Sequence, residues 1–208
     1  LGYRDFKLKI GRGNRWMDAE AGLRRDIEVT RAVREAYPDA RILVDANDGY
    51  RGDTFLTYLD AVADCDLFWI EEPFPETRDD LRRLRSRLDH LGLPTLIADG
   101  ETDPDVPALL ELAAEGLIDV LLMDVVSHGL TPWRRLLPTL RELGVRASPH
   151  AWGQPLKTMY AAAMSVGLGD IVTVEGVPGR HEDIRGYPLV DGCLQVPDAP
   201  GFGLELAR

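Results

Sequence analysis

The sequence predicts an α/β fold, most simply a (β/α)8 barrel of the TIM type that lacks its first strand. Two observations carry this prediction. Short apolar segments recur through the 208 residues with helical patterns between them, and repeated strand–helix units build parallel sheets through right-handed crossovers. Polar and charged residues also follow the ends of these segments, and the carboxyl ends of the strands form the functional mouth of such a barrel.

The predicted strands are apolar at nearly every position, which is typical of parallel strands covered on both faces. Seven segments fit this description: FKLKI (6–10), RILVDA (41–46), LFWIEE (67–72), PTLIAD (94–99), IDVLLMD (118–124), VRASPH (145–150) and IVTVEG (171–176). An open doubly wound sheet would explain the same alternation. No GxGxxG or P-loop turn follows the first strand, however, and this weakens the nucleotide-binding interpretation.

Six stretches between these strands have the apolar spacing of amphipathic helices. They are AEAGLRRDIEVTRAVREAY (19–37), DTFLTYLDAVAD (53–64), RDDLRRLRSRLDHLG (78–92), DVPALLELAAEG (105–116), PWRRLLPTLRELG (132–144) and QPLKTMYAAAMSVG (154–167). Glycine commonly ends a helix because it adopts the left-handed conformation without strain. Gly92, Gly116, Gly144 and Gly167 are therefore the candidate helix ends.

The composition limits the classes of function. The chain has 24 Lys and Arg against 35 Asp and Glu, a formal net charge of −11, and this acidic balance argues against nucleic acid or an anionic membrane as a partner. The same balance suits a bound divalent cation. No apolar run approaches the roughly 20 residues that span a bilayer. Cys65 and Cys193 lack metal-ligand spacing, which favours a reducing, cytoplasmic setting.

One polar residue stands at or just beyond the end of each predicted strand. The set is Lys9, Asp45, Glu71, Glu101, Asp124, His150 and Glu175. Any one of them alone could be an ordinary loop residue or a helix cap. Their recurrence in step with the strand–helix unit indicates a site, because parallel strands bring their carboxyl ends to one edge.

Three of these residues suit a metal site. Asp45, Glu71 and Glu101 come from successive strands and offer hard carboxylate oxygens, which favours Mg²⁺, with Mn²⁺ as the alternative, over zinc. A turn role in DANDGY is the competing interpretation for Asp45 and Asn47. Glu71 and Glu72 do not form a glycosidase pair, because neighbouring side chains on a strand point to opposite faces.

Acid/base groups flank the predicted metal site. Lys7 and Lys9 share one face of their strand. A second ammonium group lowers the pKa of its neighbour, so that a neutral amine can act as a base, and Lys7 can also hold a substrate carboxylate. His150 has Asp124 in reach, and such a carboxylate fixes the histidine tautomer. With Mg²⁺, these groups can abstract a proton next to a carboxylate and stabilise the enediolate.

Short motifs follow one another along nearly the whole chain. They are KLK (7–9), VDAND (44–48), WIEEP (69–73), DGE (99–101), MD (123–124), SPH (148–150), VEG (174–176) and the ending VPDAPGFGLEL (196–206). Each motif is weak by itself, but the ordered set resembles the enolase superfamily and, within it, the mandelate racemase (mandelate racemase/muconate lactonizing enzyme) subgroup. The resemblance implies a modified (β/α)7β barrel.

The resemblance also implies a role for each residue. Asp45, Glu71 and Glu101 would bind Mg²⁺. Lys9 would be one acid/base group, and His150 with Asp124 would be the opposing one. Lys7, Asn47 and Glu175 would contact the substrate. The family's usual turn after the sixth strand is replaced by VVSHGLT. His128 therefore lies where relatives often differ in specificity, and it is either a substrate contact or a solvated loop residue.

The resemblance further implies parts outside this sequence. Family members carry an N-terminal α+β capping domain and a first barrel strand before the KxK strand, whereas this sequence begins without Met on a strand-like segment. We therefore expect an N-terminal part to precede residue 1. Residues 1–182 would form the barrel domain with the catalytic residues, and residues 183–208 a C-terminal tail that packs on the capping domain. Family members form dimers or octamers, so a homo-oligomer is expected.

The predicted function is a Mg²⁺-dependent dehydratase of an acid sugar, a lyase that gives a 2-keto-3-deoxy acid through an enediolate. Lys9 or His150 would remove the proton next to the carboxylate, and His150 would protonate the departing 3-hydroxyl group. A racemase or epimerase of a 2-hydroxy acid, which is an isomerase, needs the same groups and is the nearest alternative. A catalytically inert barrel fragment is the alternative from a different class.

Overall fold

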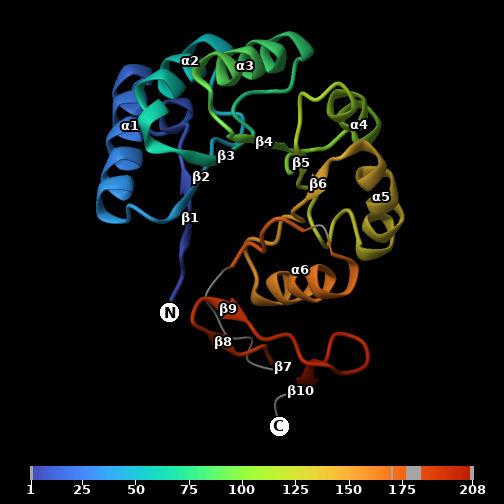
Figure 1. Ribbon diagram of the computed structural model, residues 1–208. Coiled ribbons are helices and arrows are strands. Elements are labelled where there is room, and N and C mark those ends of the chain that lie inside the picture. The colour runs from blue at the N-terminus through green and yellow to red at the C-terminus, as the bar shows by residue number, and fades with distance from the viewer. Residues whose placement is uncertain (1, 170, 177–183, 207–208) are drawn as a thin grey trace. The chain divides into compact units, whose positions relative to one another are not determined.

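The computed structural model describes residues 2–169, 171–176 and 184–206 (Figure 1). The chain divides into two compact units. The first unit holds residues 4–102 and 106–119, and the second holds residues 2–3, 103–105 and the described residues from 120 onward. Each unit has parallel strands that alternate with helices, so the predicted α/β class is confirmed.

The first unit is built on parallel strands that lie side by side in the order of the sequence. These strands are β1 (Asp5–Lys9), β2 (Arg41–Asp45), β3 (Leu67–Glu71) and β4 (Leu96–Asp99). Lys9 pairs with Asp45 across β1 and β2, and Asp45 pairs with Glu71 across β2 and β3. Because the strands run in one direction, this register brings the three residues to the same edge.

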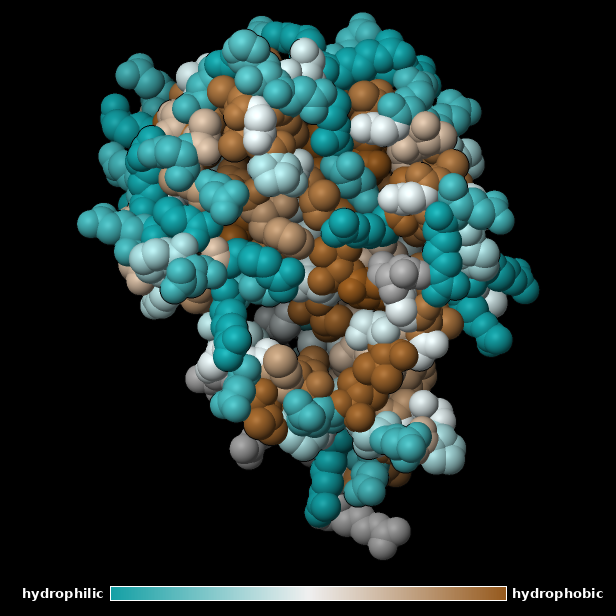
Figure 2. All heavy atoms as spheres, in the orientation of Figure 1, coloured by the Kyte–Doolittle hydropathy of each residue, from teal (hydrophilic) through white to brown (hydrophobic). Residues whose placement is uncertain are grey.

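Helices cover the strands of the first unit. They are α1 (Ala19–Ala36), α2 (Gly52–Ala61), α3 (Arg78–Leu91) and α4 (Val106–Ala114), with the 3₁₀ turns η1 (Arg12–Asn14) and η2 (Ala63–Cys65). Helix α3 shows why they fold, since Leu81, Leu84 and Leu88 recur on one face and are fully buried. Hydrophilic side chains dominate the outer rim over these helices (Figure 2).

The second unit has shorter strands. Its elements are β5 (Val120–Leu121), α5 (Leu130–Leu143), β6 (Arg146–Ala147), α6 (Pro155–Leu168), β7 (Ile184–Arg185), β8 (Leu189–Val190), β9 (Cys193–Leu194) and β10 (Glu205–Leu206). β5 pairs in parallel with β6, whereas β8 with β9 and β7 with β10 are antiparallel. The predicted strands over residues 118–124, 145–150 and 171–176 are too long. β5 and β6 hold two residues each, and within 171–176 only Ile171 forms a bridge, with Ala147.

The C-terminal segment packs on α6. Met159 and Ala162 of α6 are buried together with Tyr187, and Leu194 packs against this cluster. The segment therefore has a hydrophobic anchor inside its own unit. Its packing on a capping domain stays a prediction, and the boundary expected after residue 182 lies outside the described residues.

The helix ends follow the predicted glycines with one exception. Gly92 and Gly144 end α3 and α5 in the left-handed conformation, and Gly116, with a φ of 74°, follows α4. Gly167 lies inside α6, and Gly169, with a φ of 69°, ends that helix instead. The helical hydrogen bonding continues past Gly167, and sequence alone does not show which of two nearby glycines adopts a positive φ.

Among the described residues, no helix is both long and apolar enough to cross a membrane.

A buried carboxylate on α1 holds the loop after β1. Asp26 is 1% exposed, and its Oδ2 accepts hydrogen bonds from the backbone N–H groups of Gly11 at 2.7 Å and Arg12 at 3.2 Å and from the Tyr50 hydroxyl at 2.6 Å. Gly11 has a φ of 77°, and a Cβ there would lie 2.7 Å from the carbonyl oxygen of Ala46. Asp26 thus fixes the loops that follow β1 and β2.

Asp26→Ala is expected to lower the free energy of unfolding by about 3 kcal/mol, because two backbone N–H groups and a tyrosine hydroxyl would lose their acceptor. Urea unfolding at neutral pH measures the change. Asp39→Ala is the matched control, since Asp39 is exposed, and should cost less than about 0.5 kcal/mol. A cost as small as that of the control would contradict the anchoring role of Asp26.

Candidate functional site

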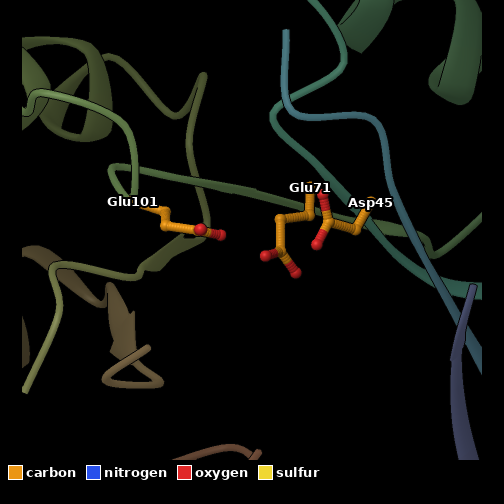
Figure 3. Close-up of side chains that lie close together, drawn as sticks. All are labelled: Asp45, Glu71 and Glu101. Carbon is orange, nitrogen blue, oxygen red and sulfur yellow. The ribbon is translucent and has the colours of Figure 1, made fainter. Parts of the chain in front are cut away.

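Three carboxylates meet at the carboxyl edge of the strands in the first unit (Figure 3). Asp45 and Glu71 are the last residues of β2 and β3, and Glu101 follows β4 by two residues. Each contributes an oxygen, and these oxygens lie within 4.8 Å of one another. Asp45 and Glu71 are buried, and Glu101 points toward them from its loop. Hard oxygen donors at this spacing suit a divalent cation.

The two lysines of β1 compensate the charge of these carboxylates. The Lys7 Nζ lies 3.1 Å from Asp45 Oδ2 and 2.8 Å from Glu71 Oε1. The Lys9 Nζ lies 2.6 Å from Asp45 Oδ2 and also donates to Asn47 Oδ1. Burial by itself would raise the pKa of Asp45, but the charges of Lys7 and Lys9 outweigh burial and hold that pKa below its usual value.

The sequence alone explains only in part why Lys7 and Lys9 share one face of β1. It suggests repulsion between the two ammonium groups, solvation of their face and a substrate carboxylate as reasons, whereas the structure places the protein's own Asp45 Oδ2 beside both ammonium groups. Attraction to this carboxylate opposes the repulsion. The side chains of Lys7 and Lys9 are 21% and 52% exposed, so the lysine face is partly solvated as well as ion-paired.

Asp48, after β2, and Asp99, at the end of β4, have raised pKa values, chiefly because they are buried and secondarily because other carboxylates lie near them. Burial, and after it the charges of Glu72, Glu76 and Glu101, raise the pKa of Asp48 to about 7. Burial, with Glu76 and Glu72 nearby, also raises the pKa of Asp99 well above its ordinary value. A divalent cation at Asp45, Glu71 and Glu101 would offset the part of the rise in the Asp48 pKa that Glu101 and Asp45 cause.

A further buried carboxylate holds the loop that carries Glu101. Glu72 Oε1 accepts a hydrogen bond from the backbone N–H of Thr102 at 2.6 Å, and Glu72 Oε2 accepts one from the Thr102 hydroxyl at 2.8 Å. Asn47 Nδ2 donates to Glu72 Oε2 at 3.5 Å. Glu72 therefore has partners of its own, distinct from those of Glu71. Sequence analysis missed this positioning role, for which the Glu–Glu pair gives no signal.

In the second unit the structure brings Asp124, His150 and Glu175 together. His150 Nδ1 lies 2.9 Å from Asp124 Oδ2, and His150 Nε2 lies 3.5 Å from Glu175 Oε2. The same Glu175 oxygen accepts a hydrogen bond from the backbone N–H of Ala151 at 3.0 Å. An ionised carboxylate can only accept, so Nδ1 of His150 carries the hydrogen that points to Asp124. Nε2 is then the nitrogen that faces Glu175.

Asp124 is held from more sides than the sequence indicates. Lys157, in the first turn of α6, donates to Asp124 Oδ2 at 2.6 Å, and the backbone N–H groups of Val126 and Ser127 donate to Oδ1 at 2.9 Å each. Burial by itself would raise the pKa of Asp124, but the hydrogen bonds from Lys157, these N–H groups and His150 lower it. Sequence analysis missed Lys157. The signal that could have found it is a cation in the first turn of a helix, where the helix dipole opposes positive charge.

His128 makes a different set of contacts. Its backbone N–H donates to the Asp124 carbonyl oxygen at 3.0 Å, and its ring lies edge-on to Trp133 with 5.5 Å between the ring centroids. Burial lowers the pKa of His128. The ring is half-buried rather than solvated, and its contact with a substrate stays a prediction.

The whole sequence, residues 1–208, matches the family described as enolase C-terminal domain-like. The chain belongs to this family. D-galactarolactone cycloisomerase from Agrobacterium fabrum (strain C58) is 32% identical over 223 residues, which cover 100% of this chain and 55% of that protein. Racemases and epimerases are also among the relatives.

Solved structures of the enolase family share the fold. Galacturonate dehydratase from Geobacillus sp., complexed with D-galacturonate and 5-keto-4-deoxy-D-galacturonate, gives a TM-score of 0.93 at 35% identity over 99% of this chain and 56% of that chain. A mandelate racemase/muconate lactonizing protein from Geobacillus sp. Y412MC10, complexed with magnesium and tartrate, gives 0.92 at 34% identity over 99% and 54%. The predicted superfamily and fold class are thus confirmed. The enolase-family chain spans about half the length of the curated relatives it matches.

Mg²⁺ is expected to stabilise this enolase-family protein through Asp45, Glu71 and Glu101. At a hundredfold excess over its dissociation constant, the cation should add about 2.7 kcal/mol to the free energy of unfolding, and chelation should reverse the gain. Glu101→Gln removes one ligand with little change of shape and should abolish most of the gain. Unfolding of the whole protein with and without Mg²⁺ measures both effects.

Asp79→Asn is the matched control for Glu101→Gln, because the Asp79 side chain is 93% exposed on α3. It should keep the full gain from Mg²⁺. An equal gain in the two variants would exclude the three carboxylates as the binding site.

Proposed function

We propose that the whole protein is a Mg²⁺-dependent dehydratase of an acid sugar, which removes the proton next to a carboxylate and eliminates water to give a 2-keto-3-deoxy acid. One observation carries the proposal. The oxygen cluster of Asp45, Glu71 and Glu101 lies directly beside two ammonium groups, those of Lys7 and Lys9. A cation site next to a potential base is what the abstraction of a weakly acidic C–H proton requires.

The relatives support this reaction class. The galacturonate dehydratase structure holds D-galacturonate, and the curated cycloisomerase is named for D-galactarolactone. The neighbour from Geobacillus sp. Y412MC10 holds magnesium together with tartrate, a small dicarboxylate. A small hydroxylated carboxylate is therefore the substrate class that we propose for this protein.

The first unit is assigned to the metal and the substrate carboxylate. Asp45, Glu71 and Glu101 would hold Mg²⁺, which when bound supplies positive charge that stabilises the enediolate. Lys7, beside the first two of these carboxylates, binds the substrate carboxylate through charge-assisted hydrogen bonds. Asn47 accepts a hydrogen bond from the Lys9 ammonium group and lines the site on that side.

Two groups are assigned to proton transfer. The Lys9 Nζ takes or returns the proton at C2, and its ion pair with Asp45 fixes where the amine points. Asp124 holds Nδ1 of His150, so Nε2 can give a proton to the departing 3-hydroxyl group, which leaves as water. Glu175, 3.5 Å from Nε2, is assigned to a hydrogen bond with the carboxylate or enediolate, for which Glu175 must carry a proton.

Racemisation or epimerisation of a 2-hydroxy acid is the second candidate. It uses the same two acid/base groups, one to remove the C2 proton and the other to return a proton to the opposite face. Relatives named N-succinylamino acid racemase and hydrophobic dipeptide epimerase favour it. The fate of the 3-hydroxyl group separates the two reactions.

Proton NMR in D₂O distinguishes these functions. The whole protein is incubated with Mg²⁺ and a pool of mono- and dicarboxylate sugars. The expected result is loss of a C2 proton signal together with new 3-deoxy methylene signals, and the sugar that is consumed identifies the substrate. If deuterium enters C2 and the carbon skeleton stays intact, the protein is a racemase or epimerase and the proposed dehydratase function is wrong. A pool that stays unchanged although Mg²⁺ binds would favour a catalytically inert barrel.

His150→Asn is expected to lower dehydration by about a thousandfold, because the departing hydroxyl group loses its proton donor. Exchange of the C2 proton with D₂O should persist, since Lys9 remains, and Lys9→Met should abolish it. NMR of the consumed sugar measures both reactions in one sample. His90→Asn, at an exposed histidine on α3, is the control and should leave both rates unchanged. Undiminished dehydration in His150→Asn would refute its assigned role.

A further inference from the structure

Lys157 lies among the side chains around His150 and has no part in the function proposed above. Its Nζ lies 2.6 Å from Asp124 Oδ2, the same oxygen that lies 2.9 Å from His150 Nδ1. The other oxygen, Oδ1, accepts hydrogen bonds from the backbone N–H groups of Val126 and Ser127. Both oxygens of Asp124 thus have two donors each, and the carboxylate cannot rotate without breaking several hydrogen bonds.

The use of lysine at this position stands out in this chain. Of its 24 Lys and Arg residues, 21 are arginine, and lysine occurs only at positions 7, 9 and 157. Arginine forms ion pairs on exposed helix faces, as between Arg87 and Asp60, and also at the buried Asp26, where the Arg12 Nε lies 3.8 Å from Oδ1. Lys7, Lys9 and Lys157 all contact buried carboxylates at or just beyond the ends of strands. An ammonium group is a compact point charge that can share one carboxylate oxygen with a second donor, whereas a guanidinium favours the planar, two-oxygen contact.

The place of Lys157 in its helix supports a specific purpose. It is the third residue of α6 (Pro155–Leu168), whose N-cap is Gln154. A positive charge in the first turn is repelled by the helix dipole and would stabilise the helix only at the opposite end. The ion pair with Asp124 offsets this cost, because the Lys157 side chain is only 26% exposed and its partner 10%.

We propose that Lys157 is a positioning residue for the acid/base histidine: it holds the Asp124 carboxylate against Nδ1 of His150 and places a positive charge beside the dyad that opposes protonation of the imidazole. The inference rests on the proposed role of His150. Asp124 alone would favour the charged imidazolium by its negative charge. Lys157 cancels part of that charge and repels a second cation. Glu175 also faces the ring, with its Oε2 3.5 Å from Nε2.

NMR titration of the histidine side chains tests this inference without any substrate. The whole protein is titrated, and the His150 signal is identified by its absence in His150→Gln. Lys157→Met is expected to raise the midpoint of the His150 titration by about 0.5 to 1 pH unit, because a positive charge beside the dyad is lost. Lys157→Gln keeps a hydrogen-bond donor without charge and should give the same shift, so it serves if the methionine variant fails to fold.

Two controls separate charge from general effects of substitution. Lys157→Arg keeps the charge but not the compact shared-oxygen contact, so the midpoint should rise by less than it does in Lys157→Met. Arg135→Met removes one exposed cation from α5 of the same unit and should not move the midpoint. Once a substrate is known, kcat/KM of Lys157→Met should fall about tenfold, and its acidic limb should move upward with the His150 midpoint.

An unchanged or lowered His150 midpoint in the methionine and glutamine variants would overturn the inference, whatever the activity. If the His150 midpoint rises in these variants but the protein turns over no acid sugar, the action of Lys157 on His150 stands. The proposed dehydratase function would then be wrong. The failure of this inference and the failure of the proposed function therefore give different results.

Discussion

The site depends on one constraint, which is that a carboxylate withdrawn from water needs cations or hydrogen-bond donors beside it. Asp45 is fully buried at the end of β2, and burial alone would favour its neutral form. Lys7 and Lys9 reverse this preference because the parallel register of β1 and β2 places their ammonium groups 3.1 and 2.6 Å from one Asp45 oxygen. The lysine strand is thus the counter-charge of the proposed metal ligands and also the source of the proposed base.

The second unit meets the same constraint with different donors. Asp124 is ionised because Lys157 and two backbone N–H groups bind it, and one of its oxygens remains in place to orient His150. In each unit a carboxylate surrounded by donors holds a side chain that can carry a proton, Asp45 for Lys9 and Asp124 for His150. In the proposed reaction these carboxylates do not exchange protons with the substrate, and they supply the positional accuracy that proton transfer needs.

Buried carboxylates also fix the loops that carry the site. Asp26 binds the loop after the lysine strand, and Glu72 binds Thr102, the residue next to Glu101. The geometry of the site therefore depends on polar contacts that lie outside it. A substitution at Asp26 or Glu72 would affect both stability and the placement of the site residues, because each carboxylate satisfies donors that have lost water.

The sequence by itself determined the order of strands and helices and the placement of polar residues at strand ends, because hydrophobic periodicity is local and parallel strands bring their last residues to one edge. It overstated the strand over residues 171–176 and chose Gly167 as a helix end, since pairing and backbone conformation depend on neighbours far along the chain. Only the tertiary structure decided which donors share a carboxylate oxygen. Lys157 reaches Asp124 across 33 residues, and such a contact is set by tertiary packing within the second unit rather than by any spacing in the sequence.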